Sequence, residues 1–263
     1  MHQSLYKNIQ AACCHISVSV SGELVSEGSG FAFLPEGQVL TAAHVVTGRV
    51  PIQEKDYVDP NQKILCKFPG RAEEEYRVHI CGMNIEVPGF SEAVQIDIAI
   101  IVPITSIPNP INHLIANTNP PNLGQTVFVA GYSDEVKVPF GLDRLASGGE
   151  ASLSQASQSS HGGYMTDLGG PIVKKGVIGN IVRAVCGYAN NSKELQIELF
   201  YIDNSIHSGA SGGPVCNERG EAIGIISQRS VTSASQESAP NLEVPSGCTI
   251  GIGLNPIKAL AEA

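Results

Sequence analysis

The 263-residue chain contains no tryptophan, and aromatic residues make up only 5% of it. No apolar run reaches the ~20 residues that a membrane-spanning helix needs, and the N-terminal stretch lacks the apolar core of a secretory signal. Lys and Arg do not cluster, and the net charge is −9. These absences argue against a membrane span and against partners such as nucleic acid or an anionic membrane.

The seven cysteines show no metal-binding or disulfide pattern. Cys13 and Cys14 are adjacent to each other and to His15, which is not the usual spacing of metal ligands. We therefore expect no metal and no cofactor. An odd number of cysteines without a secretory signal favours reduced thiols and a cytoplasmic protein.

Short apolar runs recur along the chain, separated by turns that draw on 28 Gly and 16 Pro. This pattern predicts an all-β barrel or sandwich. A short C-terminal helix is expected over 255–263, with Asn255 as its cap and Pro256 at its first position. The Ser-rich stretches 145–163 and 230–240 are predicted to be surface loops.

The sequence HSGASGGPV, at 207–215, places Ser211 between glycines. It satisfies the G-x-S-x-G pattern of the α/β-hydrolases, in which the acid and the histidine follow the serine. The chain after Ser211 contains neither His nor Asp. That fold is therefore excluded, and any base that activates Ser211 must come from upstream.

Two upstream residues are suited to this task. His44 ends the sequence VLTAAH, which follows a predicted strand, turn and strand. Asp97 is the one carboxylate in the apolar run QIDIAIIV, where an ionised group needs a hydrogen-bonding partner such as a His N–H. Asp203, eight residues before Ser211, is a second candidate acid, for which a structural role is favoured.

The motifs TAAH at 41–44, DIAII at 97–101 and GASGGP at 209–214, in that order, resemble those of the chymotrypsin-like (trypsin-like) serine proteases. GSGFAF at 28–33 and IGIGL at 250–254 are similar to the bacterial HtrA/Deg branch, and we expect a protease domain of this type without a PDZ domain. The resemblance implies two antiparallel β-barrels. We expect a first barrel over 1–110, a linker over 111–124 and a second barrel over 125–263.

The resemblance also implies the roles of the site residues. Ser211 would be the nucleophile of an endopeptidase, His44 the general base and then acid, and Asp97 the group that orients His44. The N–H groups of Gly209 and Ser211 would form the oxyanion hole. Ser227 matches the family serine that supports the triad acid.

The substrate pocket is expected to be neutral. By the resemblance, Ser205 lies at its base, and the further lining residues are Ile226, Ser227 and Gly251. A pocket without a carboxylate favours apolar residues over Arg or Lys before the scissile bond. Arg229 is the alternative, since it could reach the entrance and attract an acidic residue.

Two further expectations concern regulation and the competing interpretation. The residue before Ser211 is Ala210, where secreted trypsin-like enzymes carry the Asp that binds a newly cleaved N-terminus. Activation without cleavage is therefore expected, with protein or peptide substrates and a regulatory protein as partners. The alternative is a catalytically silent binding module that keeps the protease fold.

Overall fold

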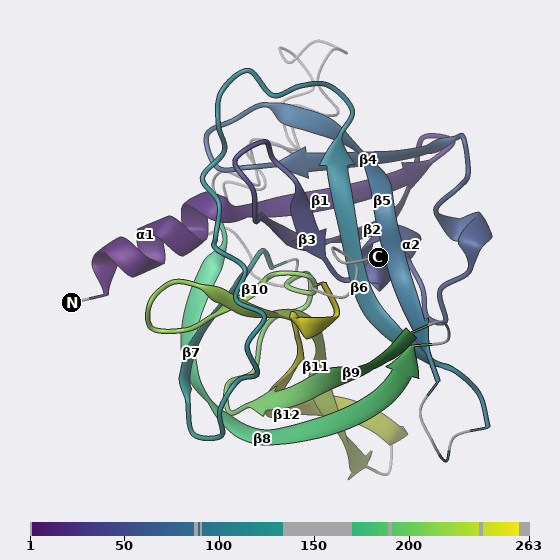
Figure 1. The fold of residues 1–263 in the computed structure, drawn as a ribbon, viewed down its shortest axis with the longest axis vertical. Helices are drawn as coiled ribbons and strands as arrows, with labels where there is room; N and C mark the ends of the chain where they lie inside the picture. The colour runs from purple at the N-terminus through teal and green to yellow at the C-terminus, as the bar shows by residue number, and fades with distance from the viewer. Residues whose placement is uncertain are drawn as a thin grey trace.

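The structure is a computed structural model that confirms the predicted all-β, two-barrel fold. Its strands form two closed barrels of six strands each, and all neighbouring strands are antiparallel (Figure 1). The described residues are 2–86, 89, 91–133, 170–188, 191–236 and 239–257.

The first barrel is built by the N-terminal part of the chain, drawn in purple to teal in Figure 1. Its strands follow the order β1-β2-β3-β6-β5-β4 around the ring. Successive side chains of a strand point alternately into and out of a barrel, which explains the short alternating apolar runs. The strands are β1 (Cys13–Val20), β2 (Glu23–Ala32), β3 (Val39–Thr41), β4 (Gln62–Lys67), β5 (Glu73–Ile85) and β6 (Val94–Pro103).

The second barrel has the strand order β10-β11-β12-β9-β8-β7. Two long hairpins, β8–β9 and β11–β12, provide four of its strands. The strands are β7 (Thr126–Gly131), β8 (Ile172–Tyr188), β9 (Asn191–Ile202), β10 (Pro214–Cys216), β11 (Ala222–Gln236) and β12 (Ala239–Gly253).

The segment between β6 and β7 contains no strand and one isolated β-bridge, between Ala116 and Ala222. The predicted linker, 111–124, falls within this strand-free segment, and its exact limits stay a prediction. Two short helices complete the first barrel: α2 (Ala43–Thr47) and the 3-10 helix η1 (Glu54–Asp56).

An N-terminal helix, α1 (Gln3–Ala12), was not predicted from the sequence. Ile9 and Ala12 are fully buried, and the ring of Tyr6 lies edge-on to Phe128 of β7 at 5.6 Å between centroids. Gln10 Nε2 donates a hydrogen bond to the carbonyl of Pro171 (3.1 Å). The helix is thus stabilised by packing on the second barrel, and short helices generally depend on such tertiary contacts.

One other local expectation was wrong. Residues 230–236 belong to β11 and pair with β12, for example Val231 with Pro245, so this Ser-rich stretch is a hairpin strand rather than a loop. Asn255 begins the helical turn 255–257, and its Nδ2 donates to the carbonyl of Gln196 (2.6 Å). The rest of that helix, and the stretch 145–163, lie outside the described residues.

Glu198 of β9 is an unusual residue of the second barrel. Its side chain is fully buried, and neither carboxyl oxygen has a hydrogen-bond partner among the described residues. Burial raises the pKa of this carboxyl, and the charge of Arg183 and the nearby side chain of Gln196 only partly oppose the shift. Because the unfolded chain loses this proton first as the pH rises, the folded state loses stability between the unfolded and the folded pKa.

We therefore expect Glu198→Gln to stabilise the protein at pH 7 by about 1–3 kcal/mol, the range for a buried polar group without compensation. Near pH 3, where the carboxyl is mostly protonated in both states, the gain should shrink. Urea unfolding at the two pH values measures it, with the exposed Glu23→Gln as control. A destabilised Glu198→Gln at pH 7 would mean that the carboxylate has a partner in the folded protein.

Candidate active site

His44 lies in the first turn of α2, directly after β3. The small side chains of Ala42 and Ala43 are fully buried and let the turn pack tightly against the end of the barrel. The helix ends at Gly48, whose φ of +72° is in the left-handed region that glycine adopts readily. The imidazole is held at the barrel rim with 25% of its side chain exposed.

Asp97 of β6 accepts hydrogen bonds from two groups of His44. Its Oδ1 accepts from the backbone N–H (2.9 Å), and its Oδ2 lies 2.8 Å from the ring Nδ1. Oδ2 also accepts from the hydroxyl of Ser227 (2.9 Å). With Nδ1 as the donor to Asp97, Nε2 of His44 is left as the basic nitrogen.

Ser211 follows the tight turn that leads into β10. Its Oγ donates to the carbonyl of Ser227 (3.1 Å) and makes no hydrogen bond to the ring of His44, which the structure also describes. Ser227 thus links two of the predicted triad residues, since it bonds Asp97 through its hydroxyl and Ser211 through its carbonyl. The hydroxyl of Ser211 must leave the Ser227 carbonyl before it can donate to Nε2.

The backbone around Ser211 has the form expected of an anion site. Gly209 has a φ of +85° and Gly212 a φ of +83°, values that disfavour a residue with a Cβ. Within the described part of the chain, the N–H groups of Gly209 and Ser211 donate no hydrogen bond. Two free donors on either side of Ala210 are available to a developing oxyanion.

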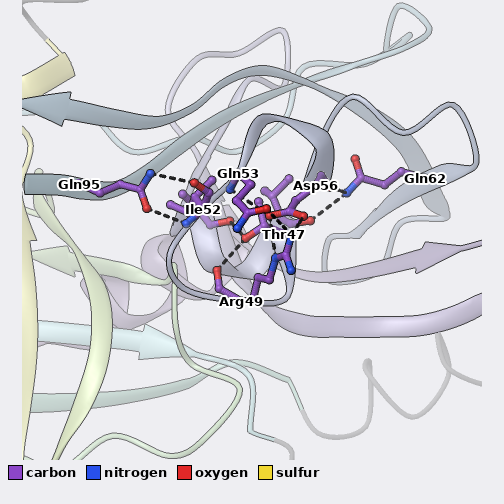
Figure 2. Close-up of polar contacts among 9 residues, drawn as sticks. Thr47, Arg49, Ile52, Gln53, Asp56, Gln62 and Gln95 are labelled. Atoms are coloured by element: carbon purple, nitrogen blue, oxygen red, sulfur yellow. Dashed lines mark hydrogen bonds and ion pairs between the residues drawn. The ribbon is translucent and has the colours of Figure 1, made fainter. Parts of the chain in front are cut away.

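A hydrogen-bonded loop after α2 links the histidine to the strand of its acid (Figure 2). Gln95, two residues before Asp97, accepts from the N–H of Ile52 (2.6 Å) and donates to its carbonyl (3.0 Å). Arg49 bonds Asp56 through two nitrogens and thereby lowers the pKa of that carboxyl. Because Arg49 is exposed, the pair contributes little to stability by itself, but the loop ties α2 to β6.

The predicted pocket residues differ in their burial and contacts. Ser205 is half-buried, and its carbonyl accepts a hydrogen bond from Nζ of Lys174 (2.6 Å). The side chain of Ile226 is fully buried in the core of the second barrel, and its backbone bonds the N–H of Gly212 (2.7 Å). A Cβ on Gly251 would lie 2.4 Å from the ring of Phe200, so packing requires glycine there.

Asp203 is placed away from the histidine. Its Oδ1 accepts from the N–H of Val177 on β8 (2.6 Å), and its own N–H donates to the Val177 carbonyl (3.0 Å). The contacts of Asp203 therefore anchor the segment that leads to Ser211, while Asp97 is the acid that bonds His44.

Sequence reasoning assigned no role to Ser29 or to Lys174, although both contact the predicted site. GSGF at 28–31 entered only as part of a motif, and Lys174 lies in a separate strand. Among the described residues, no group of three or more His, Cys, Asp or Glu side chains could hold a metal. None of the described helices has the length and apolar character to cross a bilayer.

Two closed antiparallel barrels with a His-Asp pair on one and a serine on the other define the chymotrypsin-like class of folds. A family model described as "Trypsin-like peptidase domain" matches residues 28–225. The chain belongs to this family. The match includes all three predicted triad residues.

Solved structures of the Rv3671c protease from M. tuberculosis share the fold. The active form is 16% identical with a TM-score of 0.51, and the alignment covers 97% of this chain and 81% of that one. An inactive mutant form is 18% identical with a TM-score of 0.51, covering 98% and 89%. A comparison with curated proteins finds no significant match.

Proposed function

We propose that the chain is a serine endopeptidase that cleaves peptide bonds through an acyl-enzyme on Ser211. The observation that carries the proposal is the pairing of Asp97 with both the N–H and Nδ1 of His44, beside a serine turn with two free N–H donors. This arrangement supplies a basic nitrogen from the first barrel and an anion site from the second.

The chemistry assigns one task to each group. Ser211 Oγ attacks the scissile carbonyl while its proton passes to His44 Nε2, and the N–H groups of Gly209 and Ser211 bind the oxyanion. The C–N bond then breaks, and the leaving amine takes the proton from His44. Water, deprotonated by the same imidazole, hydrolyses the acyl-enzyme and regenerates Ser211.

A quenched-fluorescent unfolded protein, such as labelled casein, tests this proposal. Purified chain should release fluorescence, and the Ser211→Ala variant prepared in parallel should not. Equal signals from the two proteins would point to a contaminating protease and leave the proposal without support.

A catalytically silent binding module is the second candidate, and one observation favours it. Ser211 Oγ bonds the Ser227 carbonyl instead of His44, an arrangement that cannot transfer the proton. The two functions differ in whether the wild-type protein cleaves the peptide that it binds. A silent module would bind unfolded peptide equally well in the wild type and in the Ser211→Ala variant, and neither protein would cleave it.

We expect the enzyme to disfavour Arg and Lys before the scissile bond. The ammonium of Lys174 lies at the backbone of Ser205, and a second cation bound nearby would be repelled. Peptides with an apolar residue at this place should show kcat/KM at least ~10-fold above those with Lys. Lys174→Met should reduce the ratio of kcat/KM for apolar peptides to kcat/KM for Lys peptides. Lys175→Met, at the exposed neighbouring residue, should leave this ratio unchanged. Strict cleavage after Lys would contradict the pocket assignment.

Activity should not require removal of the N-terminal segment. Ala210 has no charge to bind a new amine, and the helix α1 that precedes β1 packs on the second barrel. We expect full hydrolysis of the quenched substrate while intact-mass spectrometry shows the unprocessed chain. Activity that appears only after α1 is cleaved off would contradict this expectation.

We further propose a reducing, cytoplasmic location and a bacterial origin. The free thiols of Cys13, Cys14, Cys66 and Cys216, all buried, support the reducing location.

Protein or peptide substrates follow from the proposed reaction. A regulatory protein partner is proposed only because an intracellular protease needs restraint.

A further inference from the structure

Ser29 belongs to β2 of the first barrel, yet its polar contacts reach the second. The residue is fully buried. Its Oγ donates to the carbonyl of Gly209 (2.8 Å) and accepts from the N–H of Tyr132 (2.8 Å). Its own N–H donates to the carbonyl of Ser211 (2.8 Å).

These bonds fix the peptides on both sides of Ala210. Ser29 holds the carbonyls of Gly209 and Ser211, and the carbonyl between them, that of Ala210, accepts from the N–H of Gly213 (3.0 Å). All three successive carbonyls are therefore bonded. The N–H of Ser211 shares its peptide plane with the Ala210 carbonyl, so the bond from Gly213 defines its direction, and the Ser29 bonds hold the two neighbouring peptides.

The backbones of the two barrels also touch at this point. A Cβ on Gly212 would lie 2.2 Å from the carbonyl oxygen of Ser29, and one on Gly28 would lie 3.2 Å from that of Ser211. The space between β2 and the serine turn is therefore too small for a side chain at position 212. A change at Ser29 is transmitted directly to the turn.

We propose that Ser29 is a positioning residue that orders the oxyanion loop, defined as residues 209–212, from the opposite barrel. The proposal rests on the proposed peptidase function. Ala210 has no charge with which to order this loop. Ser29 supplies the ordering contact instead, because its hydroxyl, on the first barrel, fixes the loop without any charged N-terminus. Formation of the anion site is thereby coupled to the docking of the two barrels.

Ser29→Ala keeps the backbone N–H and removes only Oγ. The Gly209 carbonyl and the Tyr132 N–H then each lose their bond to Ser29, which favours rotation of the Gly209–Ala210 peptide. This peptide carries neither oxyanion donor, but its rotation changes the torsions of Gly209 and Ala210 and so loosens the two flanking peptides, which carry the N–H groups of Gly209 and Ser211. Loss of one oxyanion donor typically lowers kcat by about 10²–10³-fold. Misalignment of a donor in Ser29→Ala should therefore lower kcat by about 10–100-fold. KM should change little, since the ground-state carbonyl needs the donors less than the transition state does.

Thr41→Val is the matched control. Thr41 is also fully buried, and its Oγ1 donates to the carbonyl of the same Ser29 (2.7 Å). Its loss therefore destabilises the contact between β3 and β2 within the first barrel, without releasing the Gly209 carbonyl. Both variants should show a lower melting temperature. Only Ser29→Ala should lose kcat and, in parallel, affinity for a peptide boronic acid that mimics the tetrahedral intermediate.

The experiment measures kcat, KM and boronic-acid affinity for the wild type and both variants, together with amide hydrogen exchange of the peptide that spans 210–213. Faster exchange there in Ser29→Ala than in Thr41→Val is expected even if the wild type proves inactive, which separates this inference from the proposed function. Three results would each overturn the proposal. They are a wild-type kcat in Ser29→Ala, equal losses of kcat in both variants, and unchanged amide hydrogen exchange of 210–213 in an inactive protein.

Discussion

Ser211→Ala and His44→Ala should each lower peptide turnover by as much as ~10⁶-fold, because the members of a triad act as a unit. Removing the hydroxyl deletes the nucleophile, and removing the imidazole deletes the group that receives its proton. The double variant should be no slower than either single one. Turnover of the quenched substrate measures all three proteins.

Folding must be controlled in the same experiment. His44 lies in a buried turn, so circular dichroism and melting temperature should be compared with those of the wild type. A folded His44→Ala protein that retains a tenth of the activity would show that another group takes the proton of Ser211.

Asp97→Asn should reduce turnover by about 10⁴-fold, because an amide in place of the carboxylate stabilises the wrong imidazole tautomer. In this structure the carboxylate accepts from the N–H and Nδ1 of His44 and from the Ser227 hydroxyl. The side chain of Asn has only one carbonyl oxygen. Its NH₂ group would therefore face at least one of these three donors.

Asp203→Asn provides the comparison for this prediction. Asp203 bonds the backbone of Val177, so its amide variant should lower stability and change turnover by less than about 10-fold, within the range of indirect effects. Loss of activity in Asp203→Asn together with retained activity in Asp97→Asn would show that the acid has been assigned wrongly.

The fold class and the pairing of His44 with Asp97 were predictable because their signals are local. Alternating apolar residues define strands wherever one face is buried. A single carboxylate within QIDIAIIV has to find a donor, and the structure supplies three hydrogen bonds to it.

The residues that sequence reasoning missed depend on contacts between distant segments. Ser29 and Gly209 are 180 positions apart, and nothing in GSGF indicates which carbonyl its hydroxyl will bond. Lys174 likewise reaches Ser205 from a neighbouring strand.

The helix α1 and the strand at 230–236 were missed for a related reason. Tyr6, Ile9 and Ala12 lie on one face of α1, but this face has a partner only once Phe128 is in place. Ser and Thr at 230–236 are usual in loops, yet they form a strand because β12 lies alongside them. Tertiary context overrode local preference in both segments.

Covalent labelling with a fluorophosphonate tests most directly whether Ser211 is an activated nucleophile. The reagent forms a stable adduct with a serine whose proton can pass to a neighbouring base. Intact wild-type chain should gain one adduct, peptide mapping should place it on Ser211, and Ser211→Ala should gain none. A folded wild-type protein that stays unlabelled, or a label found equally in Ser211→Ala, would contradict the account.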